Sequence, residues 1–543
     1  MPATPVRVMG LVLKMACPRA TVQGVRRNSL APRHGFGTRF IAQSSSILVG
    51  LTDSQSIRSP ARPAWAGRAG DEADKMIESG AHTRVYCMSG QSGGEMRTSL
   101  LMGMLIGAVC LCGQSGKSLP AASNIAKLPD DILPDSLSRL PLVKREDMDE
   151  NGQRVFDLIS GPHRTTRLSG PAALSLYSPR AAEPLELLNR WLRANGALGS
   201  RLTELAILVA ARELDQQYEW SGHEPAALRA GVDPAVIDVI RYNKDASGLE
   251  AKESLIIRLG RQLFRQRRVD SDIFAEAAEL FGRQGTLELS ALLGDYAMVG
   301  IMLEAVDQHS PPERLSALPA VAGVGPRIGK PGQFTAPLAR STSLPRDVYP
   351  DSLCRLPSIK REDLTADGKR VWDIVVGPAV KIPQLGPVGI SFYSPNIAEQ
   401  MNYLNEYLRK QSILGRRMTE LTIIVAGREM NHQFEWAAHS PQALREGVDQ
   451  SIIDVIKYDK TLAGLGEKDA SAVRLGRELF RDKKVSSETF AQAVKLFGRQ
   501  GVVEMVGIMG NYYMVSLMLD VVGQQLRPEW EPTLPVRQAA LAN

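Results

Sequence analysis

The chain has 543 residues, 44% of them hydrophobic and 23% charged, which is ordinary for globular protein but too long for a single core, so two or more domains are expected. The net charge of +6 arises in residues 1–95, which hold 12 basic and 6 acidic residues, because the remaining 53 basic and 53 acidic residues cancel. The neutral body has no basic stripe to meet phosphates, which disfavours nucleic-acid binding.

Residues 1–95 mix Arg, Ser, Gly and Pro without hydrophobic periodicity, which predicts disorder, and we interpret them as an extension ahead of a true start at Met96. A short basic start there precedes a 13-residue apolar run at 100–112 and small or polar residues to 123. This is the layout of a secretory signal peptide, and the run is too short to span a bilayer. Residues 96–123 therefore predict export, with the periplasm as the expected location.

Two other locations stay open. Residues 1–52 contain no acidic residue and several Arg and Ser, so they also fit an organellar transit peptide. A chain that used neither signal would remain in the cytoplasm.

Residues 130–310 recur without a gap 216 positions later. Between 198–242 and 414–458 the two copies are identical at 27 of 45 positions. This internal repeat predicts one domain at 130–310 and a second at 346–528. The segment between them, 311–345, is rich in Pro, Gly, Ser and Ala and is typical of a linker.

Each copy is expected to be all-α. Apolar residues three and four apart, with turn signals between them, predict helices in the first copy at 150–159, 181–194, 201–214, 216–222, 225–230, 234–241, 251–267, 271–281 and 286–308. No convincing alternating strand pattern accompanies them.

The last helix of each copy is apolar nearly all round, which predicts burial. Two such helices in one chain suggest that the copies pack together as a fused pseudo-dimer with a shared core. Glu288, Asp295 and Glu304 argue against a membrane span at this helix.

Cysteine usage excludes thiol chemistry in the repeats. Of five cysteines, only Cys354 lies inside them, and its counterpart is Ser138. Neither a disulfide framework, a CxxC redox pair nor a thiolate metal site can be built there.

Chemically interesting residue types are retained in both copies. Only one histidine pair is among them. The retained pairs are Glu204/Glu420, Arg212/Arg428, Glu213/Glu429, Glu219/Glu435, Trp220/Trp436, His223/His439, Asp238/Asp454, Tyr242/Tyr458, Arg283/Arg499, Glu288/Glu504 and Tyr296/Tyr512.

Glu219 and His223 are four residues apart and share a helix face. If the preceding helix folds back as a hairpin, Glu204 reaches the imidazole. A carboxylate beside a histidine raises the ring's pKa and fixes its tautomer, which suits proton delivery near neutral pH. Pro225 follows closely and predicts a kink or restart of the helix. In the second copy Ser440-Pro441 would put His439 near a new helix N-terminus, with the opposite effect on its pKa.

Structural interpretations stay open beside this one. Trp220 fits a core residue as well as a substrate wall, and a histidine near a kink is often structural. Arg283 and Glu288, which flank an expected turn at Gly285, suit an ion pair or a helix cap.

Tyr242 and Tyr296 suit core positions with a hydroxyl group to satisfy. A zinc site of His432, Glu435 and His439 is a weaker alternative, because the first copy has Gln216 in place of His432.

The pattern TELAILVAAREL-x-x-x-YEW-x-x-H-x-x-x-A-L-x-x-GV, followed by FGRQG-x-x-E, resembles the carboxymuconolactone decarboxylase family, which has the all-α alkylhydroperoxidase D-like fold. The resemblance covers both copies. The family's peroxidase relatives use a glutamate, a CxxC pair and a histidine. Gln216 and Glu219 stand at those cysteine positions here, with His432 and Glu435 in the second copy, so thiol peroxidase activity is disfavoured.

The decarboxylase branch converts 4-carboxymuconolactone to an enol-lactone and CO₂ without a cofactor. The resemblance therefore implies a cofactor-independent lyase for a small carboxylated lactone or related acid, with no metal. It implies His223 and His439 as proton donors oriented by Glu204 and Glu420. Further candidates for substrate binding are Glu219, Trp220 and Arg212 in the first copy and Glu435, Trp436 and Arg428 in the second.

Members of this family are usually single-domain homo-oligomers, often rings of six, so three two-domain chains could form an equivalent ring. The alternative from another class is a protein of the same superfamily without catalytic activity, which binds a small molecule or serves only for assembly.

Overall fold

The computed structural model describes residues 128–161, 168–326, 329–337 and 343–538. All of these belong to the structural unit Lys117–Asn543. The N-terminal extension at 1–95 and the signal peptide at 96–123 are predictions that lie outside the described residues.

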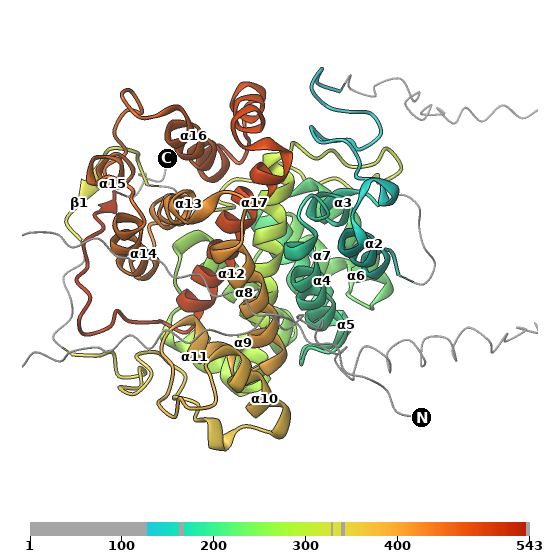
Figure 1. Ribbon diagram of the computed structural model, residues 1–543. Coiled ribbons are helices and arrows are strands. Elements are labelled where there is room, and N and C mark those ends of the chain that lie inside the picture. Colours follow the sequence, from blue (N-terminus) through green and yellow to red (C-terminus); the bar gives the residue numbers. More distant parts are fainter. Residues whose placement is uncertain (1–127, 162–167, 327–328, 338–342, 539–543) are drawn as a thin grey trace, which may run out of the picture. The chain divides into compact units, whose positions relative to one another are not determined.

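The described residues are mainly helical, which confirms the predicted all-α class (Figure 1). The first repeat contains a short 3₁₀ turn, η1 (Arg145–Asp147), and then α2 (Glu150–Ser160), α3 (Gly170–Ser175), α4 (Pro179–Ala194), α5 (Gly199–Leu214), α6 (Gln217–Arg229), α7 (Pro234–Arg241), α8 (Ala251–Gln266) and α9 (Ser271–Ala305).

The second repeat has the same order of elements, coloured yellow to red in Figure 1. It consists of η2 (Arg361–Asp363), α10 (Ala366–Val375), α11 (Pro387–Ser391), α12 (Pro395–Lys410), α13 (Gly415–Glu429), α14 (Gln433–Arg445), α15 (Gln450–Lys457), α16 (Glu467–Asp482) and α17 (Ser487–Val521). Two strands of two residues each, β1 (Phe334–Thr335) and β2 (Val536–Arg537), pair antiparallel. The short helices α3 and α11 were not predicted.

Helix α6 runs through Pro225, and α14 runs through Pro441, so of the predicted kink or restart at these prolines the restart is wrong. A proline removes one backbone donor from a helix. The first turns of α6 are nevertheless buried from Tyr218 to Ser221, and this burial outweighs the lost hydrogen bond. His439 therefore lies inside α14 and not at a new helix N-terminus.

Helix α9 bends at Gly282, whose φ of 69° lies in the left-handed region that favours glycine. The hydroxyl of Thr286 donates to the Gly282 carbonyl at 2.8 Å and so ties the second segment to the bend. The expected turn at Gly285 was therefore placed three residues too late. Gly285 lies within the helix, where an added Cβ would come within 2.9 Å of the Phe281 Cβ.

The apolar segments of α9 and α17 pack against each other at the centre of the described residues (Figure 1). The approach is close because a glycine of each helix receives a methionine of the other. A Cβ on Gly294 would lie 2.7 Å from Cγ of Met514, and a Cβ on Gly510 would lie 2.6 Å from Cγ of Met298. By length and composition either helix could cross a membrane, but its apolar stretch is fully buried within protein, as core helices are.

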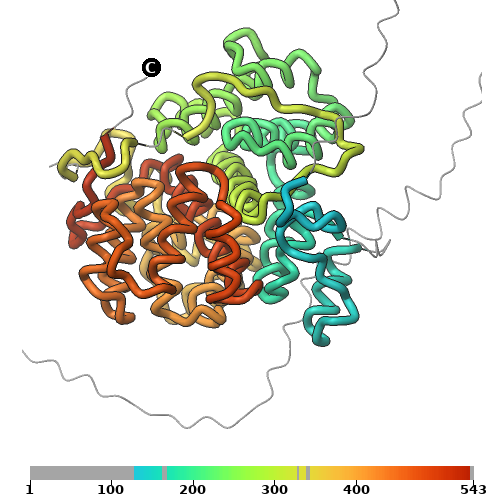
Figure 2. Tube along the Cα trace, turned by 90° about the horizontal axis from the view of Figure 1, so that it is seen from above, coloured from blue at the N-terminus to red at the C-terminus, as the bar shows by residue number. Residues whose placement is uncertain are grey.

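Further contacts between the repeats come in reciprocal pairs. Arg139 donates to the carbonyl of Val485 at 2.7 Å, and its counterpart Arg355 donates to the carbonyl of Val269 at 2.7 Å. Seen from above, the first repeat (cyan to green) and the second (orange to red) lie side by side (Figure 2).

Glu288 and Glu504 also form equivalent contacts between the two repeats. Ser394 of the second repeat donates to Glu288 at 2.8 Å, and Ser178 of the first donates to Glu504 at 2.8 Å. Glu288 also accepts from the backbone N–H of Ala197 at 2.7 Å. The expected partnership of Glu288 with Arg283 is thus replaced by bonds to a loop and to the other repeat.

Part of the predicted linker is bound to the first repeat. Gln217 of α6 forms two hydrogen bonds with it, donating to the carbonyl of Ser316 at 2.6 Å and accepting from the N–H of Leu318 at 2.7 Å. The C-terminal tail repeats the second contact, since Leu534 donates to Gln433 of α14 at 2.9 Å. Each repeat therefore ends in an extended segment, here called its strap: residues 316–325 lie against α6, and the tail around Leu534 lies against α14.

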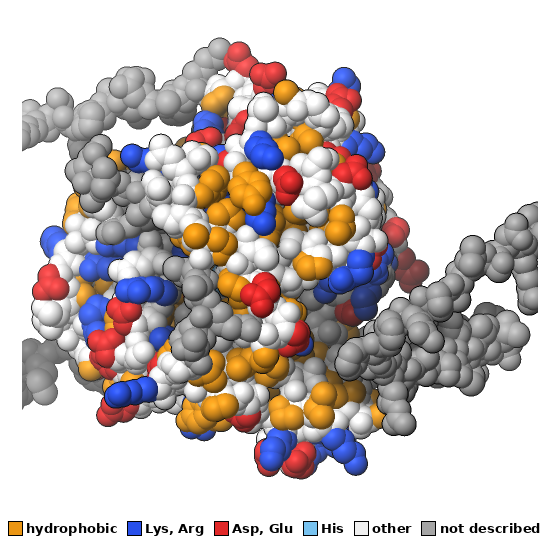
Figure 3. All heavy atoms as spheres, turned by 90° about the vertical axis from the view of Figure 1, so that its left-hand side faces the viewer, with side chains coloured by type: hydrophobic (Ala, Val, Ile, Leu, Met, Phe, Trp, Pro, Cys, Tyr) orange, Lys and Arg blue, Asp and Glu red, His pale blue; other side chains and the backbone are white. Residues whose placement is uncertain are grey.

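On the face shown in Figure 3, basic and acidic side chains are intermixed among hydrophobic ones. This distribution agrees with the charge balance expected for the body of the chain.

Gly294→Ala and Gly510→Ala are each expected to lower the free energy of unfolding by about 1–3 kcal/mol, because the added methyl group must displace the facing methionine. Chemical denaturation measures the change. Gly248→Ala is the control, because an added Cβ at this exposed glycine has no neighbour within 4 Å. Equal stability of all three variants would contradict the close approach of α9 and α17.

Candidate active site

In the first repeat, helices α5 and α6 form a hairpin that brings a glutamate to a histidine. Glu204 lies on the buried helix α5, and His223 lies two turns into α6. The Oε2 atom of Glu204 is 2.7 Å from Nδ1 of His223. The second repeat places Glu420 of α13 2.8 Å from Nδ1 of His439 on α14. The predicted convergence of acid and imidazole is therefore present in both halves.

The other ring nitrogen of each histidine faces a second carboxylate. Nε2 of His223 is 3.4 Å from Oε2 of Glu219, and Nε2 of His439 is 3.6 Å from Oε2 of Glu435. These pairs are four residues apart on one helix, so the helix itself sets their separation.

A tyrosine from the long central helix closes the site in each half. The hydroxyl of Tyr296 lies 3.3 Å from Nε2 of His223, and the two rings meet edge to face with centroids 5.1 Å apart. Tyr512 meets His439 in the same way at 4.9 Å. Tyr296 is buried, as expected, and its hydroxyl contacts the imidazole, whereas the core position expected for Tyr242 is wrong because this residue is exposed.

An arginine completes the set, and the sequence analysis missed it. Arg193 at the end of α4 donates to Oε1 of Glu204 at 3.0 Å, and Arg409 of α12 donates to Oε1 of Glu420 at 3.0 Å. Both arginines are retained between the copies. That identity was the signal that could have identified them.

The surroundings set the charges of the first site. Burial by itself lowers the pKa of His223, but hydrogen bonds to Glu204 and Glu219 outweigh it and raise the pKa above its ordinary value. Burial raises the pKa of Glu204, yet the bond to His223 and the charge of Arg193 lower it overall. Both shifts favour the charged forms, the protonated imidazole of His223 and the carboxylate of Glu204. The side chain of His223 remains 14% exposed.

In the second site, burial raises the pKa of Glu420, but its bond to His439 and the charge of Arg409 lower it overall. Burial raises the pKa of Glu435, against the opposing charges of His439 and His432. The pKa values of the two carboxyl groups beside one imidazole are thus shifted in opposite directions, which is typical of acid–base sites.

The two sites differ at one buried position on the central helices. Asp295, next to Tyr296, accepts a hydrogen bond from Asn189 at 2.7 Å and is fully buried. Burial raises its pKa to about 7. Its counterpart Asn511 carries no charge and donates to Asn405 at 3.4 Å. The first site therefore has one more ionisable carboxyl group than the second.

Other predicted binding residues lie in structural positions. Arg212 donates to the backbone carbonyls of Arg241 and Pro319, and Arg428 donates to the carbonyls of Lys457 and Pro535. These arginines tie each strap to the end of its helix hairpin. The structure does not bring them to the histidines, so it offers no support for a role as substrate anchors.

Trp220 and Trp436 also belong to the core. Both side chains are buried within the main hydrophobic cluster, and Nε1 of Trp220 donates to Glu224 at 3.0 Å. They support the fold of the hairpin and do not form a wall open to substrate.

The alternative zinc site of His432, Glu435 and His439 is not formed. No group of three or more His, Cys, Asp or Glu side chains that could hold a metal occurs among the described residues. Nδ1 of His432 instead accepts the backbone N–H of Glu435 at 3.2 Å. Cys354 is buried, and its thiol donates to the Leu356 carbonyl at 3.3 Å.

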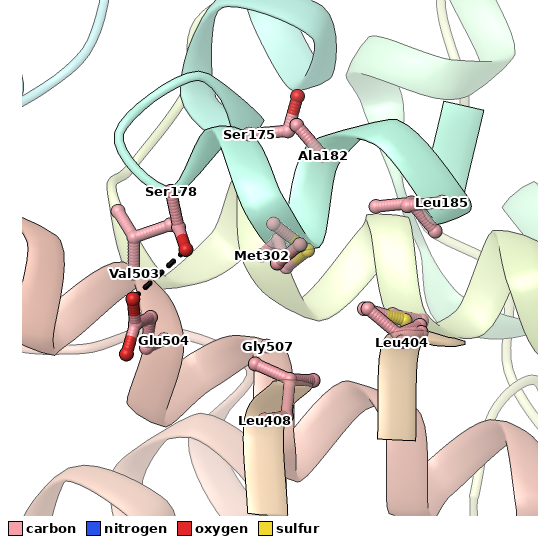
Figure 4. Close-up of a pocket in the computed structure, with 12 residues that line it drawn as sticks. Ser175, Ser178, Ala182, Leu185, Met302, Leu404, Leu408, Val503, Glu504 and Gly507 are labelled. Carbon is pink, nitrogen blue, oxygen red and sulfur yellow. Dashed lines mark hydrogen bonds between the residues drawn. The ribbon is translucent and has the colours of Figure 1, made fainter. Parts of the chain in front are cut away.

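A separate hollow lies between the repeats (Figure 4). About 280 Å³ of it is free of protein atoms, part of this being open solvent, and Ser178 and Glu504 form its polar end. Its lining includes Ala181 and Gly507, whose counterparts are the larger Ile397 and Ala291. The hollow contains none of the residues of the two histidine sites.

Comparison with known proteins agrees with the resemblance seen in the sequence. Residues 179–256 match the model of the carboxymuconolactone decarboxylase family. This segment runs from α4 to α8 and holds Arg193, Glu204, Glu219 and His223. A search of curated proteins finds no match to the chain.

Asp295→Asn is expected to stabilise the protein increasingly as the pH rises. Because the folded-state pKa of about 7 exceeds the ordinary value of 3.8, the folded protein keeps a proton that the unfolded chain releases. The free energy of unfolding therefore falls between about pH 4 and pH 7. Removing the carboxyl group should recover at most about 4 kcal/mol at pH 8 and little at pH 4.

Denaturation of this variant and of the wild type at both pH values measures the effect. The reciprocal Asn511→Asp is the matched control and should be destabilised at pH 8. A constant difference between Asp295→Asn and wild type across this range would contradict the assignment.

Proposed function

We propose that this chain is a cofactor-independent lyase that removes CO₂ from a small carboxylated lactone or a related acid. The family match of residues 179–256 supports the superfamily. The observation that carries the proposal is the contact of Glu204 with Nδ1 of His223, repeated by Glu420 and His439.

The geometry suits proton donation from Nε2. Glu204 holds Nδ1–H, which fixes the ring and stabilises its charged form. In the reaction the bond between carbon and carboxylate breaks, CO₂ leaves, and the electron pair remains on the substrate as a dienolate. Nε2 of His223 then gives its proton to carbon, and solvent restores the proton to the ring.

Arg193 and Arg409 take the role first assigned to Arg212 and Arg428. The side chain of Arg193 is 42% exposed and that of Arg409 33% exposed, so each can meet an anion that arrives from solvent. A guanidinium binds carboxylate well because its planar donors match the two oxygens.

The fused pseudo-dimer belongs to the same proposal. Reciprocal contacts such as Arg139 with Val485 and Arg355 with Val269 are those that twofold-related subunits make. A ring of three chains and export through residues 96–123 remain expectations of the sequence.

Replacing His223 and His439 together by Ala is expected to lower CO₂ release from a carboxylated lactone at least about a hundredfold, because the proton donor is lost. Far-UV circular dichroism should not change. His309→Ala is the control, because this imidazole lies in the loop after α9, 3.7 Å from Asp307. The two single variants report whether both sites are active.

If the wild-type chain releases no CO₂ from any carboxylated lactone of a panel, the lyase proposal is wrong. A binding or assembly protein without catalytic activity then takes its place.

Arg193→Met combined with Arg409→Met is expected to raise KM for the carboxylated substrate about tenfold or more, because each change removes a charged donor to the carboxylate. Steady-state kinetics measure it. Arg190→Met is the control on the same helix, because Arg190 bonds to Glu186 and to the Leu158 carbonyl. An unchanged KM in the double variant would remove the arginines from substrate binding.

A further inference from the structure

The helix that carries the catalytic histidine is capped differently in the two repeats. In the first, the side chain of Gln216 accepts the backbone N–H of Tyr218 at 3.1 Å and caps α6. In the second, Nδ1 of His432 accepts the backbone N–H of Glu435 at 3.2 Å and caps α14. One cap is an amide that does not titrate, and the other is an imidazole that does.

The cap of α14 requires an unprotonated Nδ1. A ring nitrogen accepts a hydrogen bond only through its lone pair, which a proton occupies. A doubly protonated His432 would turn an N–H toward the N–H of Glu435. The positive end of the helix dipole adds to this conflict.

Other charges nearby favour the protonated ring. Nε2 of His432 lies 3.5 Å from Oδ1 of Asp520 on α17. Burial lowers the pKa of His432, but the charges of Asp520 and Glu435 outweigh burial and the opposing charge of Arg267 from the first repeat, and they raise it overall. As the pH falls, the ring is therefore drawn toward Asp520 and away from its role as a cap.

Tyr513 and Glu304 complete these surroundings. The hydroxyl of Tyr513 accepts from Arg267 at 3.2 Å. Both Glu304 and Asp520 act on the titration of Tyr513. Burial raises the pKa of Glu304 well above its ordinary value, which favours the neutral form of this group.

We propose that His432 is a proton-sensitive positioning residue of the second site, whose protonation releases the first turn of α14 and displaces Glu435, while the Gln216 cap of α6 does not respond to protons. Glu435 is the third residue of α14 and lies 3.6 Å from the catalytic His439. Loss of the cap acts directly on the turn that holds this carboxylate. The consequence for catalysis rests on the function proposed above, but the release of the turn does not.

The test is amide hydrogen exchange of the full-length chain between pH 4.5 and pH 8, with each rate corrected for the intrinsic effect of pH. The first turn of α14 is followed, and the first turn of α6 serves as the internal control. Protection of α14 is expected to fall roughly two- to thirtyfold on acidification, the range of losing a helix cap. Protection of α6 should remain constant.

His432→Gln gives the second repeat the cap of the first. The variant should keep α14 protected at low pH, and the matched Gln216→His should make α6 sensitive to acid. If His432→Gln does not fold, His432→Asn supplies another neutral cap.

Equal acid dependence of α6 and α14 in the wild type, or acid dependence that persists in the neutral-cap variant, would overturn the proposal. The measurement needs no turnover. Its failure would leave the lyase proposal intact, and a failure of CO₂ release would leave the exchange result intact.

Discussion

Burying a carboxylate costs free energy unless it is hydrogen-bonded, and this cost organises the helices around Glu204 and Glu213. Glu204 is satisfied by His223 and Arg193, so the need to partner one buried acid joins α4, α5 and α6. Glu213, at the other end of α5, is satisfied by Arg265 and by the backbone N–H of Gly325. Because these acids lie on the most buried helix of each repeat, their partners determine where the neighbouring helices and the strap lie.

The two repeats also differ in a buried ion pair. In the second repeat Arg537 of the tail binds both Glu429 and Asp459. The first repeat has neutral residues at both counterparts. Val321 stands in place of Arg537, and Asn243 stands in place of Asp459. The arginine and the aspartate of this ion pair are thus present together in the second repeat and absent together from the first.

Helical periodicity predicted much of the fold. The expected helix at 234–241 coincides with α7, where Pro234 begins the helix and Asp233 caps it. The errors occurred where burial overrode local preference. Pro225 lies within α6 because the surrounding turns are buried, and the strap at 316–325 looked like a linker because its bonds are made by backbone groups. Backbone contacts of this kind leave no pattern in residue types.

Comparing the copies identified the acid and the imidazole of the site, but identity between copies does not say what a residue does. Arg212 and Arg193 are both retained, yet one holds a strap and the other bonds to Glu204. Their roles depend on the direction in which each side chain leaves its helix, and this direction could not be inferred from residue spacing. Differences between the copies carry the complementary information. His432 in place of Gln216 keeps the helix and its cap. The backbone of the two sites is therefore the same, while an imidazole cap can respond to protons and an amide cap cannot.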